Sequence, residues 1–190
     1  MLRLSALLCL FLVAQGFALQ ISWGKCEDKT VDVVQGFDAT KYVGKWYEVK
    51  ATPQIWELGG KCPRAEYTLA DEPGRVNVTN TMTTIIGIPA SQKGYAELVD
   101  NSGAAKLTVT FDVPIVGIRK APYWVVSTDY DSYAVVYSCS NLFGFLKIES
   151  GWVLSRAATL APSAEADVQK AIDNTGMKSS AFKTKDQSCP

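Results

Sequence analysis

Apolar and polar residues alternate with a period of two through the middle of this chain, and this pattern constrains the fold more than any other feature. Val76 and Val78 alternate with polar neighbours, and Leu107, Val109 and Phe111 do the same. Because a period of two sends successive side chains to opposite faces of a strand, these segments predict strands with one apolar face. Further β-rich runs lie at 46–50, 62–69, 94–99, 123–128, 133–139 and 151–155, which gives eight strands.

Turn-forming residues separate these strands at hairpin spacing, at 71–74, 100–103 and 129–132. Short strands joined by hairpins, without helices between them, predict an all-β antiparallel meander. Such a meander closes as an up-and-down barrel or packs as a sandwich, and periodicity does not decide between the two.

One α-helix is expected after the last strand, packed outside the sheet. Pro162 suits a first helical turn, and Glu165 and Asp167 favour its positive end. Gly176 is suited to end the helix, and Phe182 is expected in a short extra strand beyond it. The apolar face comprises Ala164, Val168, Ala171 and Ile172.

Residues 1–18 have the pattern of a secretory signal peptide. Arg3 precedes an apolar run over 4–13, and small residues surround the expected cleavage site after Ala18, with Gly16 as the alternative. The run is shorter than the ~20 residues that span a bilayer, and no other stretch of the sequence approaches that length. We therefore expect a secreted, extracellular protein with a single domain over 19–190.

Charge and cysteine content restrict the partners and the compartment. Lys and Arg number 19 and Asp and Glu number 19, so no basic surface for nucleic acid is expected. Cys26, Cys62, Cys139 and Cys189 remain after residue 18, an even number that favours two disulfides. A zinc site is the alternative, but no two of these cysteines are close in sequence and the chain has no histidine.

The absence of histidine also argues against an enzyme, because it removes the Ser-His-Asp triad and the Cys-His pair. A mechanism based on paired carboxylates stays open, but the simplest role of these carboxylates is solvation of the outer face. No cofactor or metal is expected. The carboxylates concerned are Glu48, Glu57, Glu66, Asp71 and Asp112.

Three motifs in this order resemble those of the lipocalin family. Gly44, Trp46 and Tyr47 open the first strand, 128–130 forms the turn before the seventh strand, and Arg156 follows the eighth. An arginine stacked over a tryptophan ring at the closed end of a barrel gains a cation–π energy of ~1 kcal/mol. The plain alternative is that Trp46 is ordinary core and Arg156 an ordinary surface charge. The motif residues of the turn are Thr128, Asp129 and Tyr130.

The likeness continues from about residue 24 to 190 through segments 25–26, 121–124 and 137–139, in the pattern of the apolipoprotein D and crustacyanin group of that family. The resemblance implies an eight-stranded barrel and pairs Cys26 with Cys139 and Cys62 with Cys189. It also implies a pocket for one small hydrophobic ligand, such as a fatty acid, sterol or retinoid. A carotenoid or bilin pigment is the alternative ligand. A loop-mediated protein binder or inhibitor with an empty barrel is the alternative function.

Alternation supplies the expected pocket lining. Trp152 matches a pocket tryptophan of the family and is the strongest candidate for ligand contact, although it could simply pack the wall. Asn77, in the sequon 77–79, should point to solvent and carry a glycan. The inward residues expected are Tyr67, Val76, Val78, Leu107, Val109, Tyr123, Val125, Val135, Tyr137 and Trp152.

Four connections that share one end of an up-and-down barrel are apolar where loops are usually polar. Either their side chains cap the cavity or they dock on a membrane or lipoprotein surface beside Lys61, Arg119, Lys120 and Lys147. Ile86, Ile88, Ile115, Val116, Phe143 and Phe145 are the docking residues expected. The remaining apolar residues are Ile55, Trp56, Leu58, Ile85, Pro89, Val113, Pro114, Ile118, Leu142 and Leu146. Oligomerisation stays open.

Overall fold

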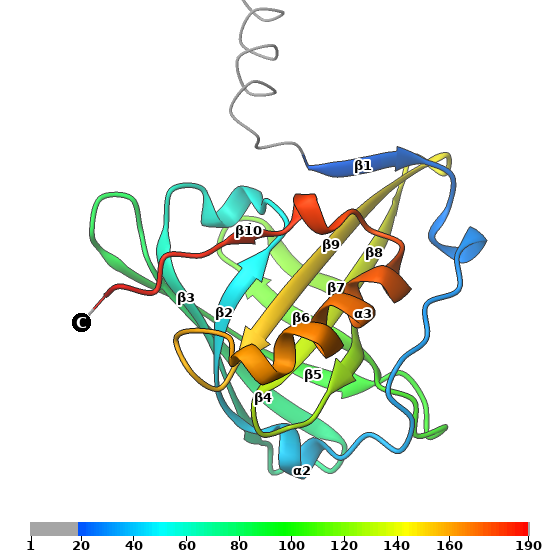
Figure 1. Cartoon of the computed structure of the whole chain (residues 1–190), viewed down its shortest axis with the longest axis horizontal. Coiled ribbons are helices and arrows are strands. Elements are labelled where there is room, and N and C mark those ends of the chain that lie inside the picture. The colour runs from blue at the N-terminus through cyan, green and yellow to red at the C-terminus, as the bar shows by residue number, and fades with distance from the viewer. Residues whose placement is uncertain (1–18, 190) are drawn as a thin grey trace, which may run out of the picture.

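The computed structural model describes residues 19–189, so the expected signal peptide lies outside the described part of the chain. Within that part, ten strands form one antiparallel sheet that closes because β9 pairs with β2 (Figure 1). The barrel is therefore confirmed over the sandwich. The strands are β1 (Gln20–Trp23), β2 (Gly44–Ala51), β3 (Lys61–Leu69), β4 (Arg75–Thr83), β5 (Pro89–Leu98), β6 (Lys106–Val113), β7 (Gly117–Thr128), β8 (Tyr133–Leu142), β9 (Leu146–Ser155) and β10 (Lys183–Thr184).

The eight expected strands are β2 to β9, and several are longer than their sequence pattern. β5 and β7 begin at Pro89 and Gly117, well before the expected starts at 94 and 123. β4 over residues 75–79 and β6 over residues 106–109 show the alternation that the sequence predicts. The connections after β2, β4, β6 and β8 lie at one end, which we call the mouth. The short helix α2 (Ala39–Tyr42) lies at the opposite, closed end (Figure 1).

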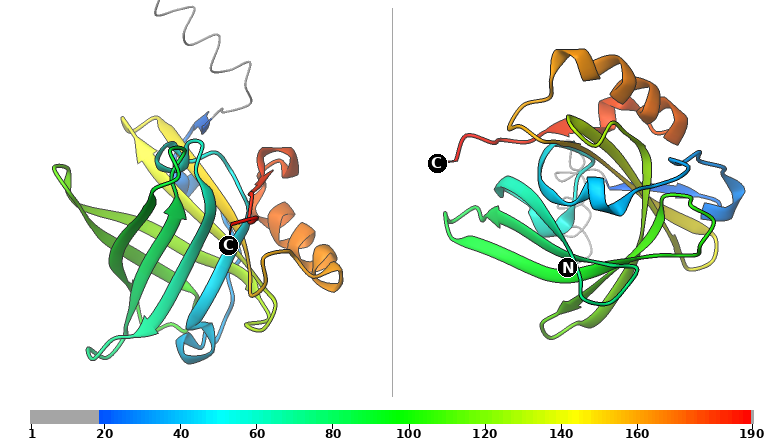
Figure 2. Two further views of the ribbon diagram at one scale, coloured as in Figure 1. Left: turned by 90° about the vertical axis from the view of Figure 1, so that its left-hand side faces the viewer. Right: turned by 90° about the horizontal axis from the view of Figure 1, so that it is seen from below.

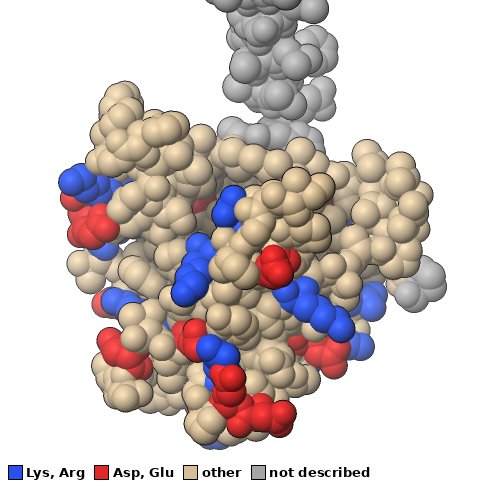
Figure 3. All heavy atoms as spheres, turned by 180° about the vertical axis from the view of Figure 1, so that it is seen from behind, with Lys and Arg blue, Asp and Glu red and all other residues tan. Residues whose placement is uncertain are grey.

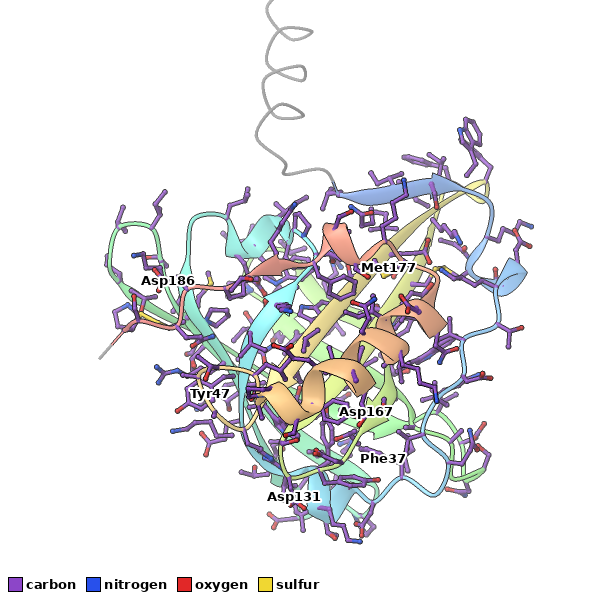
Figure 4. All side chains as sticks on the ribbon, in the orientation of Figure 1. Phe37, Tyr47, Asp131, Asp167, Met177 and Asp186 are labelled. Atoms are coloured by element: carbon purple, nitrogen blue, oxygen red, sulfur yellow. A yellow bond between two sulfur atoms is a disulfide. The ribbon has the colours of Figure 1, made fainter. Side chains whose placement is uncertain are left out.

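Helix α3 (Glu165–Thr175) packs outside the barrel against β7 and β8, as expected (Figure 2). Its buried residues are Val168, Ala171, Ile172 and Thr175, and Gly176 ends it with a left-handed φ of 64°. Pro162 and Ala164 precede α3 in a 3-10 turn, and Met177 continues the apolar contact with the sheet (Figure 4). The helix and the sheet bury a second apolar layer outside the barrel.

This outer layer corrects two expectations. Val135 and Tyr137 of β8 do not face the interior, because they pack with α3 in the outer layer. Their neighbours Ala134 and Val136 face the interior, opposite Leu154 and Trp152 of β9. Both faces of β8 are buried from Tyr133 to Cys139, so its sequence does not alternate between polar and apolar residues in a way that would reveal the inward face.

The C-terminal tail completes the wall near the mouth. β3 pairs with β2 only over residues 64–67, and the tail lies between these strands beyond that point. Lys185 donates its backbone N–H to Val49 O at 3.0 Å, and Cys62 donates to Asp186 O at 2.7 Å (Figure 4). Phe182 does not enter a strand, since β10 begins one residue later.

Two disulfides tie the ends of the domain to the barrel, with the pairing that the resemblance implied. Cys26 is bonded to Cys139, with 5.8 Å between the Cα atoms, and Cys62 is bonded to Cys189, with 6.2 Å. Each closes a loop of more than a hundred residues, and such cross-links stabilise a domain by about 2 to 4 kcal/mol.

Candidate binding site

The closed end is sealed by Trp46 and Arg156. The Trp46 side chain is fully buried, and its indole N–H donates to Tyr42 O at 2.8 Å. The guanidinium carbon of Arg156 lies 3.7 Å from the Trp46 ring centroid. Arg156 also donates to the carbonyl oxygens of Tyr130, Lys45 and Lys41 at 2.9 to 3.1 Å. The arginine thus joins three segments, which is more than an ordinary surface charge does.

The remaining motif residues shape the backbone around this pair. Gly44 has a φ of 98°, and a Cβ there would lie 3.1 Å from Arg156 Nη1, so the position favours glycine. Partial burial alone would raise the pKa of Asp129, but hydrogen bonds from Ser132 and the Tyr133 backbone lower it overall. Tyr47 lies on the outer face, under the Arg64 guanidinium. Thr128 accepts a hydrogen bond from the Tyr130 N–H.

A layer of three tyrosines lies inside the barrel above this floor. Tyr123 shares hydrogen bonds with the hydroxyls of Tyr42, at 2.9 Å, and Tyr67, at 2.8 Å. Burial raises the pKa of Tyr67 to about 12, so it stays protonated. Tyr67 and Tyr123 were expected inside. Tyr42 was not, because it belongs to a helical turn to which strand alternation does not apply.

The wall around the tyrosines is apolar. Val76, Val78, Leu107, Val109 and Val125 are buried in the inner layer, as their alternation predicts. Trp152 packs against the same layer and is only half-buried. Contact between these residues and a ligand is a prediction that a ligand titration tests.

Polar side chains occupy part of the inward face nearest the mouth. Asn80 continues the inward face of Val76 and Val78 and pairs with inward Ala65, yet it is exposed. Solvent therefore reaches the inward face at this position. Gln92 is opposite Asn80 on β5, and its amide donates to Asp112 O at 2.8 Å. These polar inward positions explain why apolar alternation fades toward the mouth.

Glu48 and Glu57 correct a further expectation, since they do not solvate the outer face. Glu48 is 7% exposed and pairs with inward Leu154 on β9. Glu57, from the 3-10 turn Ile55–Glu57, joins it through Lys185. Burial raises the pKa of Glu48 well above its usual range, the Glu57 charge raises it further, and Lys185 lowers it. No local sequence pattern predicts this cluster, because Lys185 comes from the distant C-terminal tail.

The apolar side chains of the mouth loops are exposed and do not fill the cavity. The exposed fraction is 74% for Ile86 and 78% for Phe143. In Figure 3 the projections at the top, on the mouth side, carry no charged side chains. Trp23 of β1, which sequence analysis did not single out, stacks on Phe145 with ring centroids 5.5 Å apart. The other exposed side chains here are Ile55, Trp56, Leu58, Ile85, Ile88, Ile115, Val116, Ile118 and Phe145.

The basic residues expected beside these loops are only partly available. Lys61 pairs with Asp186 at 2.8 Å, and Lys147, with 13% of its side chain exposed, pairs with Glu149 at 3.3 Å. Arg119 and Lys120 are exposed on β7. Asn77 is exposed on β4, as its glycosylation requires, and the glycan stays a prediction that glycosidase treatment of the secreted protein tests.

The described residues offer neither a membrane-spanning helix nor a metal cluster. No helix within 19–189 is long and apolar enough to cross a bilayer. No group of three or more Cys, Asp or Glu side chains is arranged to hold a metal ion in that part of the chain.

Comparisons with known proteins agree with this architecture. A family model described as a lipocalin-like domain matches residues 37–187. Apolipoprotein D of Macaca fascicularis is 36% identical over 193 residues, covering 100% of this chain and 96% of that protein. Insecticyanin from the tobacco hornworm Manduca sexta has a TM-score of 0.78 at 24% identity, over 89% of each chain. Lobster apocrustacyanin A1 has a TM-score of 0.68 at 23% identity, covering 80% of this chain and 81% of that chain.

Proposed function

Because the chain belongs to the lipocalin family, we propose that it is a secreted carrier that holds one small hydrophobic ligand in the mouth half of its barrel. The observation that carries this proposal is a difference in solvent exposure between the two halves of the barrel interior. The closed half is apolar and sealed, whereas inward residues of the mouth half, such as Asn80 and Trp152, stay accessible. Apolar inward side chains such as Trp152, together with a few polar groups such as Asn80, are typical of the walls of sites for apolar molecules.

Export and a non-catalytic role are part of the same proposal. Two disulfides persist in oxidising compartments, which supports secretion. The inner tyrosines have raised pKa values through burial, so they act as neutral hydrogen-bonding groups and not as bases. An interior with neutral tyrosine hydroxyls is suited to ligand binding without catalysis.

A fluorescence titration tests the carrier proposal. Saturable quenching of tryptophan fluorescence is expected with at least one of the fatty acids, retinoids or sterols, because Trp152 lies on the inward face. Trp152→Ala should weaken that binding about tenfold, since a large apolar contact is lost. Trp124→Phe is the control, because the Trp124 ring lies 6.0 Å from the Tyr137 ring and packs against the outer layer. Unchanged affinity in Trp152→Ala contradicts the assignment of the ligand to this face.

Two alternatives make different predictions in simple experiments. A carotenoid or bilin carrier predicts coloured protein from native tissue, and a colourless preparation argues against it. A loop-mediated protein binder with an empty barrel predicts no saturable quenching with any apolar ligand. The exposed apolar loops favour the second alternative only if quenching is absent.

The exposed mouth loops support a second part of the proposal, docking on a lipid surface. Contiguous exposed apolar area of this kind marks a contact surface, and here it surrounds the cavity entrance. Arg119 and Lys120 on β7 are exposed beside it and complement anionic headgroups. Docking in this orientation would pass a poorly soluble ligand between lipid and barrel without crossing water.

A further inference from the structure

Three ionisable side chains from separate segments meet at the inner wall of the barrel, between its closed half and its mouth half. Lys185 Nζ lies 2.6 Å from Glu57 Oε2 and 3.2 Å from Glu48 Oε1. The exposed fractions of the Glu48, Glu57 and Lys185 side chains are 10%, 12% and 16%. We call these residues the Glu48 cluster.

The cluster faces the barrel interior. Glu48 is two residues beyond Trp46 on the same face of β2, and its partner across the strands is inward Leu154. The Glu48 charge also raises the pKa of Tyr67, which belongs to the inner tyrosine layer. Inward Trp152 lies opposite Ala51, further along β2. The cluster therefore lies between the apolar closed half and the open mouth half.

The cluster has two carboxyl groups and one cation. Two carboxyl groups share one ammonium, and Glu48 Oε1 is buried without a hydrogen bond of good geometry, although Lys185 lies within ion-pair distance. Buried charges cost stability unless they are fully paired, and an apolar wall would avoid that cost. One carboxyl group is thus left to accept a further donor or positive charge from inside the cavity.

We infer that the Glu48 cluster binds the polar end of the ligand and selects apolar molecules with a protonated amine over those with a carboxylate. This inference rests on the proposed carrier function. The cation of the ligand favours the ionised form of the second carboxyl group and pairs with it, while the apolar part of the ligand contacts the wall at Trp152 and Leu154. A fatty-acid carboxylate at the same place would instead face two carboxyl groups that share one lysine.

Three ligands with the same alkyl chain test the inference in the full-length secreted protein. Dodecylamine, dodecanol and dodecanoic acid are titrated below their micellar concentrations, with tryptophan fluorescence as the readout. We expect the amine to bind at least about tenfold more tightly than the acid, with the alcohol between them. Glu57→Gln should remove most of this preference, and Lys185→Met should increase it. Glu66→Gln, on the exposed outer face of β3, should leave it unchanged.

The outcomes separate the inference from the proposed function. Absence of quenching by all three ligands contradicts the carrier function itself. Equal affinities for the three, or tighter binding of the acid, contradict the inference and leave the carrier function standing. Equal weakening of all three ligands in Glu57→Gln, with native circular dichroism, means that the cluster only maintains the wall, which also contradicts the inference.

Discussion

At the level of single residues, Glu48 combines a structural cost with a functional position. Burial raises its pKa, the Glu57 charge raises it further, and Lys185 opposes both effects. Ionising this carboxyl group is therefore harder in the folded protein than in the unfolded chain. The stability that the protonated Glu48 contributes is fully present below about pH 4.3, the pKa of glutamate in the unfolded chain. This stability is lost as the pH rises through the higher pKa of Glu48 in the folded protein.

Replacing Glu48 by glutamine removes this penalty and nearly keeps the side-chain shape. We expect Glu48→Gln to have a higher free energy of unfolding than wild type at pH 7, with the difference shrinking toward pH 4. Urea unfolding at several pH values measures this difference, and Glu66→Gln serves as the exposed control. A variant that is less stable than wild type at pH 7 would show that the ionised Glu48 is well compensated, contrary to the direction argued here.

At the level of elements, sequence pattern predicts a strand well where one face is solvated. β4 and β6 are of this kind, and their inward residues were predicted correctly. β8 is buried on both faces, so its inward side could not be read from apolarity and Val135 and Tyr137 were misassigned. The Glu48 cluster depends on contact between β2 and a tail more than a hundred residues away, which no local pattern encodes.

The C-terminal tail acts as part of the wall, and its disulfide can be tested against the other one. Removing Cys62–Cys189 or Cys26–Cys139 by paired serine substitutions should each cost about 2 to 4 kcal/mol of stability. Only the first should also weaken ligand binding, because the tail carries Lys185 and fills the gap between β2 and β3. Thermal unfolding and the fluorescence titration measure the two effects. Equal ligand affinity in both variants would mean that the tail does not shape the site.

At the level of the whole molecule, the two ends of the barrel differ in what they present to solvent. Trp46 and Arg156 close one end with a buried ring and three carbonyl contacts. The other end surrounds the open cavity with exposed apolar loops. The difference between the ends places the proposed ligand entrance and the proposed lipid contact at the same end of the molecule.

Liposome flotation tests whether the mouth docks on such a surface. Wild type should float with vesicles of phosphatidylcholine and phosphatidylserine, and the double variant Ile115→Asp, Phe143→Asp should remain at the bottom. Burying two charges in place of two large apolar side chains should lower vesicle partitioning at least about tenfold. The matched control is Leu69→Asp, Val99→Asp, which changes exposed apolar residues at the ends of β3 and β5 on the closed side. Both variants should still bind ligand in solution, since none of the four positions lines the inner wall. Equal flotation of wild type and the mouth variant would contradict docking through these loops, because the two proteins differ only where the membrane contact is proposed.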